Sequence, residues 1–119
     1  MRYAALACIL PFVASSALAI EAKQELHCVT GPVTKTYGGT QWLVHGCTDG
    51  KSLVFTAVNG SPAAPFEFDL TYTGDGYDLD GKGSGNKTVA GAAYTDLQRL
   101  KAADVQALLK EVEAVESKR

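Results

Sequence analysis

Apolar and polar side chains alternate along the middle of the chain, and this pattern predicts β-strands. The alternation is clearest over residues 66–73, where one face would carry Phe66, Phe68, Leu70 and Tyr72, and the other Glu67, Asp69, Thr71 and Thr73. A period of two is typical of a strand with one buried face. We expect further strands at about 23–30, 40–47, 52–58 and 77–82, with a turn-rich stretch at 31–39 after the first.

Two Asp-Gly pairs separate apolar runs and predict β-hairpins, because a type I′ turn needs positive φ at both central residues. With Asp49-Gly50 as the loop, Trp42 would lie opposite Ala57 on an apolar face. The other face is also largely apolar and carries Leu43, His45, Cys47, Val54, Thr56 and Val58. We therefore expect this hairpin to be central in the sheet and covered on both sides.

The second pair, Asp75-Gly76, predicts the hairpin of the last two strands. In that register Asp69 would face Lys82 and Tyr72 would face Leu79. Its acidic residues would share one side of the sheet, namely Glu67, Asp69, Asp78 and Asp80. This acidic face could dock a basic partner. Catalysis by two carboxylates would need a cleft and one carboxyl with a raised pKa, and we expect a solvated face to give neither.

Beyond residue 86 the apolar period becomes that of an amphipathic helix, with one stripe formed by Val105, Leu108, Leu109 and Val112. Residues 95–98, Thr-Asp-Leu-Gln, fit a capping box that would start a helix near residue 96. Residues 89–94 would form either a separate short helix or the first turns of the same one. The prediction is an α+β fold: an antiparallel β-meander of four to five strands with a C-terminal helical segment packed on one face.

The N-terminus has the three-part layout of a secretory signal, with a basic start, an apolar run at 4–14 and small residues before Ile20. The run is shorter than the ~20 residues that span a bilayer, which disfavours an uncleaved anchor. Lipid attachment at Cys8 would leave too short a signal. We expect residues 1–19 to be a cleaved signal peptide and 20–119 a single small exported domain, periplasmic or secreted, with no stable membrane insertion after cleavage.

Two cysteines remain in the exported chain, Cys28 and Cys47. An even cysteine count in an exported protein predicts a disulfide. The rival is a zinc site that also uses His27 and His45. Neighbours on a strand point to opposite faces, however, which would separate His27 from Cys28. We therefore expect a disulfide, with no metal and no cofactor.

Other patterns that could carry chemistry have plainer structural explanations. Residues 78–86 partly match an EF-hand calcium loop, yet Lys82 occupies a ligand position and Val89 stands where the bidentate glutamate belongs. His45 could act as a base for Ser52 or Thr48, but no nucleophile elbow is present. The strand aromatics could line a pocket between sheet and helix, although we expect them to form the core.

The stretch from Cys47 to Phe55 resembles the cysteine-containing hairpin of the small exported C-type lysozyme inhibitors of bacteria. Ser84-Gly85 is similar to their Ser-Gly inhibitory loop. Those inhibitors are nearly all β, whereas a helical tail is expected here, and the tyrosine that closely follows their Ser-Gly is absent. The resemblance is local, and it implies a periplasmic inhibitor as one alternative function.

The chain has 11 basic and 13 acidic residues, a net charge of −2, and no basic cluster. This charge balance gives no basic patch that would bind nucleic acid. Sequons begin at Asn59 and Asn86, but they matter only in a glycosylating host. We expect a small exported, non-catalytic binding module whose partner is a protein or an envelope component. The alternatives are a carrier of a small apolar ligand between sheet and helix, a periplasmic inhibitor, and a small hydrolase.

Overall fold

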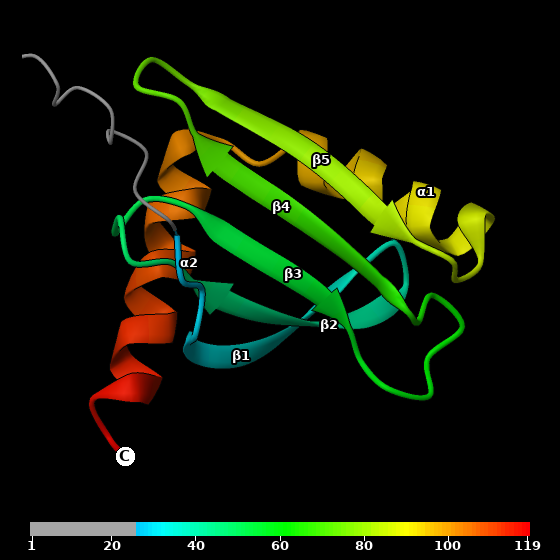
Figure 1. Cartoon of the computed structure of the whole chain (residues 1–119), viewed down its shortest axis with the longest axis horizontal. Helices are drawn as coiled ribbons and strands as arrows, with labels where there is room; N and C mark the ends of the chain where they lie inside the picture. Colours follow the sequence, from blue (N-terminus) through cyan, green and yellow to red (C-terminus); the bar gives the residue numbers. More distant parts are fainter. Residues whose placement is uncertain (1–25) are drawn as a thin grey trace, which may run out of the picture.

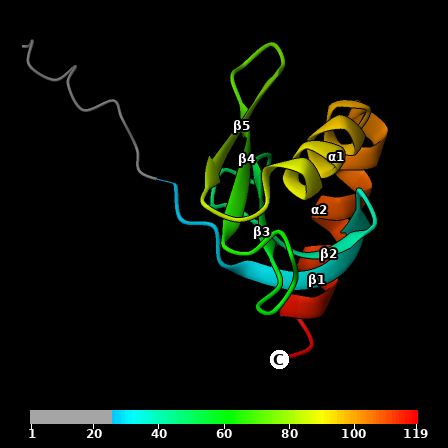
Figure 2. The ribbon, with the colours of Figure 1, turned by 90° about the vertical axis from the view of Figure 1, so that its right-hand side faces the viewer.

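A computed structural model describes residues 26–119, which form a five-stranded antiparallel sheet followed by two helices (Figure 1). The strands pair in sequence order and comprise β1 (Thr30–Tyr37), β2 (Thr40–Gly46), β3 (Leu53–Ala57), β4 (Phe66–Tyr72) and β5 (Tyr77–Gly83). Helices α1 (Lys87–Gln98) and α2 (Ala102–Glu116) lie on one face of the sheet (Figure 2). The predicted α+β meander with a C-terminal helical segment is confirmed.

The signal peptide predicted at residues 1–19 lies outside the described residues. Within residues 26–119, neither helix is long and apolar enough to cross a membrane. The sequence left open whether residues 89–94 form a separate short helix or the first turns of the following one. The structure has two helices, and the break between them falls after residue 98.

The first strand begins later in the chain than predicted. Residues 26–29 are not a strand, and β1 covers most of the stretch expected to be a turn. Gly31 and Pro32, which suggested that turn, lie within β1 where its pairing with β2 shifts register. A proline and a bulge are tolerated there because β1 is an edge strand. The turn itself is only Gly38-Gly39, where both residues have positive φ.

The hairpin of β2 and β3 has the predicted register, but that of β4 and β5 is displaced by two residues. Asp69 pairs with Asp80 instead of Lys82. The reason is the turn, because Gly74 takes the positive φ and the N–H of Thr73 donates to the carbonyl of Gly76. A shift of two residues preserves the alternation of faces, so the acidic side chains still share one side.

The predicted capping box at residues 95–98 is wrong, because this segment is the last turn of α1. The hydroxyl of Thr95 donates to the carbonyl of Gly91 one turn earlier. The true N-cap of α1 is Asn86, whose side-chain oxygen accepts from the N–H groups of Thr88 and Val89. This cap satisfies two of the backbone donors that the first turn leaves without partners.

The core lies between the sheet and the helices. Side chains at most 2 % exposed form its centre, and they include Trp42, Leu53, Phe55, Leu97 and Val112. The predicted apolar stripe of α2 contributes from the helical side. The helices pack chiefly on β1 and β2, which leaves the β5 side of the sheet less covered.

The face turned away from the helices is called here the outer face. Its side chains are those of Leu43, His45, Val54, Thr56, Glu67, Asp69, Thr71, Asp78, Asp80 and Lys82. The expectation that β2 and β3 are covered on both sides is wrong for the described residues, because both helices lie on the opposite face (Figure 2). Leu43 and Val54 are accordingly only half-buried.

Candidate functional site

A hollow of about 430 Å³ opens on the outer face, over β2, β3 and β4. Its lining includes Leu26, His45, Val54, Thr56, Glu67 and Asp69. Strand pairing places His45, Val54 and Asp69 in one row across the three strands. The small side chain of Val54 therefore separates the imidazole from the carboxylate, and the hollow has an apolar floor between polar walls.

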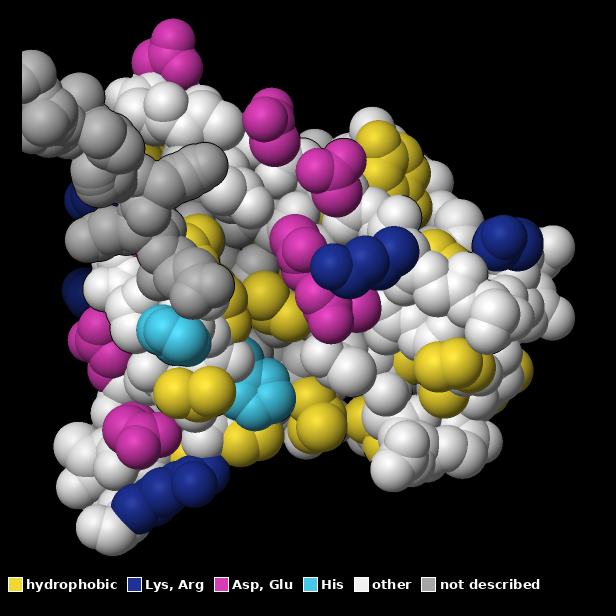
Figure 3. Space-filling model, in the orientation of Figure 1, with side chains coloured by type: hydrophobic (Ala, Val, Ile, Leu, Met, Phe, Trp, Pro, Cys, Tyr) yellow, Lys and Arg dark blue, Asp and Glu magenta, His cyan; other side chains and the backbone are white. Residues whose placement is uncertain are grey.

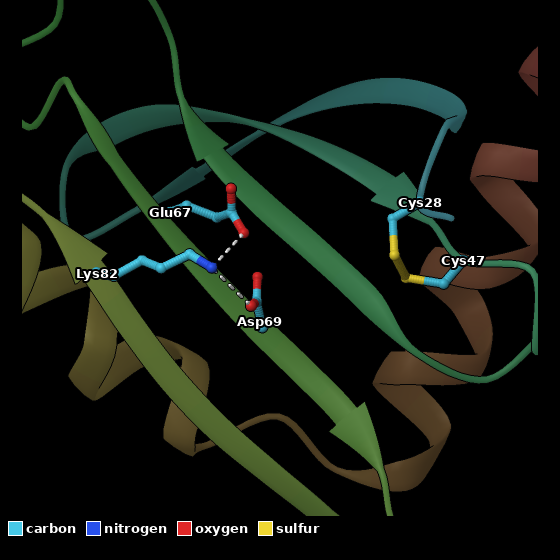
Figure 4. Close-up of polar contacts among 5 residues, drawn as sticks. All are labelled: Cys28, Cys47, Glu67, Asp69 and Lys82. Atoms are coloured by element: carbon cyan, nitrogen blue, oxygen red, sulfur yellow. Dashed lines mark ion pairs between the residues drawn. A yellow bond between two sulfur atoms is a disulfide. The ribbon is translucent and has the colours of Figure 1, made fainter. Parts of the chain in front are cut away.

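An ammonium group bridges two carboxylates beside this hollow (Figure 4). The Nζ atom of Lys82 lies 3.6 Å from a carboxylate oxygen of Glu67 and 3.6 Å from one of Asp69. The hydrogen bond with Asp69, followed by burial and the charge of Asp69, raises the pKa of Glu67 above its ordinary value. The carboxylates of Asp69 and Glu67 raise the pKa of Lys82. Such partly exposed ion pairs contribute little to stability.

Asp69 carries a polar atom without a hydrogen-bond partner among residues 26–119, the buried oxygen Oδ1. A protonated Glu67 could donate a hydrogen bond to the Asp69 carboxylate, whereas an ionised Glu67 could not. Such a bond favours the protonated form and so agrees with the raised pKa of Glu67. The expectation of a freely solvated acidic face therefore does not hold for these two residues, which are half-buried.

The structure brings all four predicted acidic residues onto the outer face. Asp78 and Asp80 lie on β5, opposite Thr71 and Asp69 of β4. Figure 3 shows acidic side chains gathered around a basic one over this part of the sheet. Four carboxylates and the ammonium of Lys82 leave this region negatively charged.

The disulfide joins Cys28 to Cys47, with an S–S distance of 2.07 Å (Figure 4). Cys28 precedes β1 instead of lying within a first strand as expected. The bridge and a hydrogen bond from the N–H of Thr48 to the carbonyl of His27 hold the chain beside the hollow. Both thiols are engaged, and within residues 26–119 no group of three or more ligating side chains could hold a metal. The disulfide indicates an oxidising, extracytoplasmic environment.

His45 and Ser52 do not form the nucleophile–base pair considered from the sequence. The hydroxyl of Ser52, 1 % exposed, donates to Asp49 at 2.6 Å and accepts from the N–H of Tyr72 at 2.9 Å. Burial, and then the positive charge of Arg119, lower the pKa of His45. Both hydrogen bonds of the Ser52 hydroxyl stabilise the fold, and neither involves His45.

Two smaller hollows open between β5 and the helices. One, of about 380 Å³, is lined by residues that include Tyr77, Leu79, Tyr94, Leu97 and Leu100. The other, of about 260 Å³, is lined by residues that include Phe66, Phe68, Gly81, Ala90, Gly91 and Tyr94. The predicted aromatic row is thus only partly core, since Phe68 is buried while Phe66 borders this hollow. The sequence allowed for a pocket lined by strand aromatics between sheet and helix, and Phe66 and Phe68 do line the smaller hollow. Nothing in the sequence indicated its helical wall, because that wall is distant along the chain.

The stretches that resemble the lysozyme inhibitors lie in ordinary structural positions. Residues 47–55 form the turn after β2 and the first part of β3. The N–H groups of Ser84 and Gly85 both donate to the carbonyl of Pro65, which holds this turn against the loop before β4. Comparison of the chain with protein-family models, curated proteins and solved structures finds no match.

Proposed function

We propose that this protein is a small exported, non-catalytic binding module whose outer face docks a protein partner rich in basic side chains. The observation that carries the proposal is the composition of the outer face. Apolar side chains lie at its centre, and four carboxylates lie on one side of them.

The apolar centre distinguishes this face from an ordinary solvated one. An antiparallel sheet with one solvated face usually turns polar residues outward. Here Leu43 and Val54 occupy outward positions beside a hollow of about 430 Å³. An apolar centre with a polar rim is the usual anatomy of a protein interface.

The charge of the face favours a basic partner. Glu67, Asp69, Asp78 and Asp80 outnumber the single ammonium of Lys82. Complementary charge speeds association and rejects acidic partners, although each exposed pair adds little affinity. The disulfide supports a location outside the cytoplasm, and the sequence of residues 1–19 supports export.

Mapping the binding of an oligolysine octapeptide by NMR tests this proposal. Amide shifts should change on β4 and β5, and an oligoglutamate octapeptide should change none. The variant Asp78→Asn/Asp80→Asn should bind oligolysine at least fivefold more weakly. The control Glu111→Gln/Glu113→Gln removes the same charge from α2 and should bind as the native protein does. Equal weakening in both variants, or shifts scattered over both faces, would contradict a specific outer-face site.

A small hydrolase is the second candidate, because His45, Glu67 and Asp69 line one hollow and the pKa of Glu67 is raised. Docking is better supported, since the ammonium of Lys82 pairs with both carboxylates, and acid–base catalysis would have to break these ion pairs. Turnover of chromogenic glycosides or esters that Glu67→Gln abolishes would favour the hydrolase.

A further inference from the structure

Strand β5 forms one edge of the sheet, and no strand within residues 26–119 pairs with its outer side. The N–H of Thr73 donates to the carbonyl of Gly76, which makes these two residues a hydrogen-bonded pair. Hydrogen-bonded and non-hydrogen-bonded pairs alternate in an antiparallel ladder. The N–H and C=O groups of Tyr77, Leu79 and Gly81 therefore point away from β4, where an added strand could bond them.

A groove runs beside this edge on the helix side. It consists of the two hollows of about 380 and 260 Å³, which share Tyr94 as a common wall. Tyr94 is 36 % exposed, which makes it one of the few exposed large apolar side chains among residues 26–119. Side chains at alternate positions of an extended segment are ~7 Å apart and all point to the same side. An added strand would therefore present a row of side chains to this groove.

Gly91, on the α1 wall of the groove, is not explained by the folded chain. A glycine within a helix costs about 1 kcal/mol relative to alanine. A Cβ at this position would meet nothing within 4 Å, so packing does not require the glycine. Gly81 across the groove differs, because a Cβ there would lie 2.6 Å from the ring of Phe68. Within residues 26–119 no contact therefore accounts for the glycine at position 91, which borders the smaller hollow.

The opposite side of the same edge is acidic. Asp78 and Asp80 alternate with the groove-facing residues of β5 and project from the outer face. A strand laid along β5 would therefore meet carboxylates on one side and an apolar groove on the other. The segment that matches both sides alternates basic and apolar residues.

We propose that the partner contributes such a segment, which adds to β5 as an antiparallel sixth strand with apolar side chains in the groove and basic ones beside Asp78 and Asp80. This inference rests on the proposed function and names the form that the partner takes. Main-chain bonds to Tyr77, Leu79 and Gly81 give affinity, and the alternating side chains give specificity.

The probe is the heptapeptide Val-Lys-Val-Lys-Val-Lys-Val, acetylated at its N-terminus and carrying a fluorophore on its C-terminal amide. Fluorescence anisotropy should show it binding at least tenfold more tightly than a peptide of the same composition with the valines grouped together. In antiparallel addition the valine N–H groups face β5. N-methylation of the two central valines should therefore abolish binding, whereas N-methylation of the central lysine should not. Equal losses from the two modifications, or a loss confined to the lysine, would overturn the arrangement.

Two leucine substitutions on α1 test the groove without threatening the fold. Gly91→Leu fills the smaller hollow. It should stabilise the helix and lower the affinity for the alternating peptide at least tenfold. Ala92→Leu places the same side chain at an exposed neighbour outside the groove and should leave affinity unchanged. Undiminished binding by Gly91→Leu would overturn the proposal.

The failure of strand addition is distinguishable from that of the proposed function. If both peptides bind equally and both weaken in Asp78→Asn/Asp80→Asn, the acidic docking face stands and strand addition is wrong. If neither peptide binds at millimolar concentration, both proposals are wrong.

Discussion

Replacing Ser52 with alanine should lower the free energy of unfolding by about 2–3 kcal/mol, although the change removes a single buried oxygen. The hydroxyl connects two parts of the chain. It donates to the Asp49 carboxylate at 2.6 Å and accepts from the N–H of Tyr72 at 2.9 Å. It thereby fastens the β2–β3 turn to the end of β4.

The magnitude follows from the two bonds. A hydrogen bond to a charged group contributes about 1.5–3 kcal/mol, and a backbone N–H left unpaired costs about 1–3 kcal/mol. The two losses do not add fully, because Asp49 still accepts from the N–H groups of Lys51 and of residue 52 itself. Alanine leaves almost no cavity, so packing adds little to the expected loss.

The effect should also depend on pH. Burial alone would raise the pKa of Asp49, but its hydrogen bonds with Ser52 and Lys51 outweigh burial and lower it. A lowered carboxyl pKa in the folded state stabilises the protein above the unfolded pKa, near 4. That stabilisation disappears as the pH falls through the folded-state value. The difference between Ser52→Ala and the native protein should therefore be smaller at pH 2 than at pH 7.

Guanidinium denaturation with the disulfide intact, followed by the fluorescence of Trp42, measures these differences. Ser61→Ala is the matched control, because the Ser61 hydroxyl is buried without a hydrogen-bond partner among residues 26–119. Removing the Ser61 hydroxyl should leave the free energy of unfolding unchanged or raise it slightly. Equal effects of the two substitutions, or a loss below about 0.5 kcal/mol for Ser52→Ala, would refute the assigned role of the hydroxyl.

Replacing the Cys28–Cys47 pair with serines opens a loop with a sequence separation of 19, and the same denaturation should show a loss of about 3 kcal/mol. Gly38→Ala should destabilise more than Gly39→Ala. Both residues have positive φ, but only at Gly38 would a Cβ lie 2.3 Å from the backbone nitrogen of Ala93. A chain of residues 20–119 in tenfold molar excess should leave a C-type lysozyme active in a cell-wall lysis assay, because the Ser-Gly turn is held against a neighbouring loop. Stoichiometric inhibition would instead favour the inhibitor alternative.

The sequence predicted the composition of each sheet face better than it predicted strand positions. The face on which a side chain lies depends only on whether its position in the strand is odd or even. A register error of two residues therefore left Asp69 and its acidic neighbours on the predicted side. Strand positions depend on pairing with distant residues. Gly31 and Pro32 read locally as a turn, yet pairing with β2 places them in an edge strand.

The sequence allowed for a pocket between sheet and helix, but the helical wall of the groove and the raised pKa of Glu67 could not be predicted from it. Tyr94 and Phe66 are 28 positions apart in the sequence, and only the packing of α1 beside β5 makes them walls of one hollow. The pKa of Glu67 depends on a half-buried carboxylate two positions along the same strand. Alternation places the two carboxylates on one face, but it does not predict how far that face is buried.

Gly81 and Gly91 border the same hollow, but packing within the fold requires a glycine only at position 81. Both interrupt regular elements, and in the sequence they look alike. The ring of Phe68 occupies the space beside Gly81, so packing accounts for that glycine. The space beside Gly91 is empty, so the helix bears a cost of about 1 kcal/mol without a compensating contact. A side chain from a partner strand would supply that contact, which is why Gly91→Leu is the most direct test of the groove.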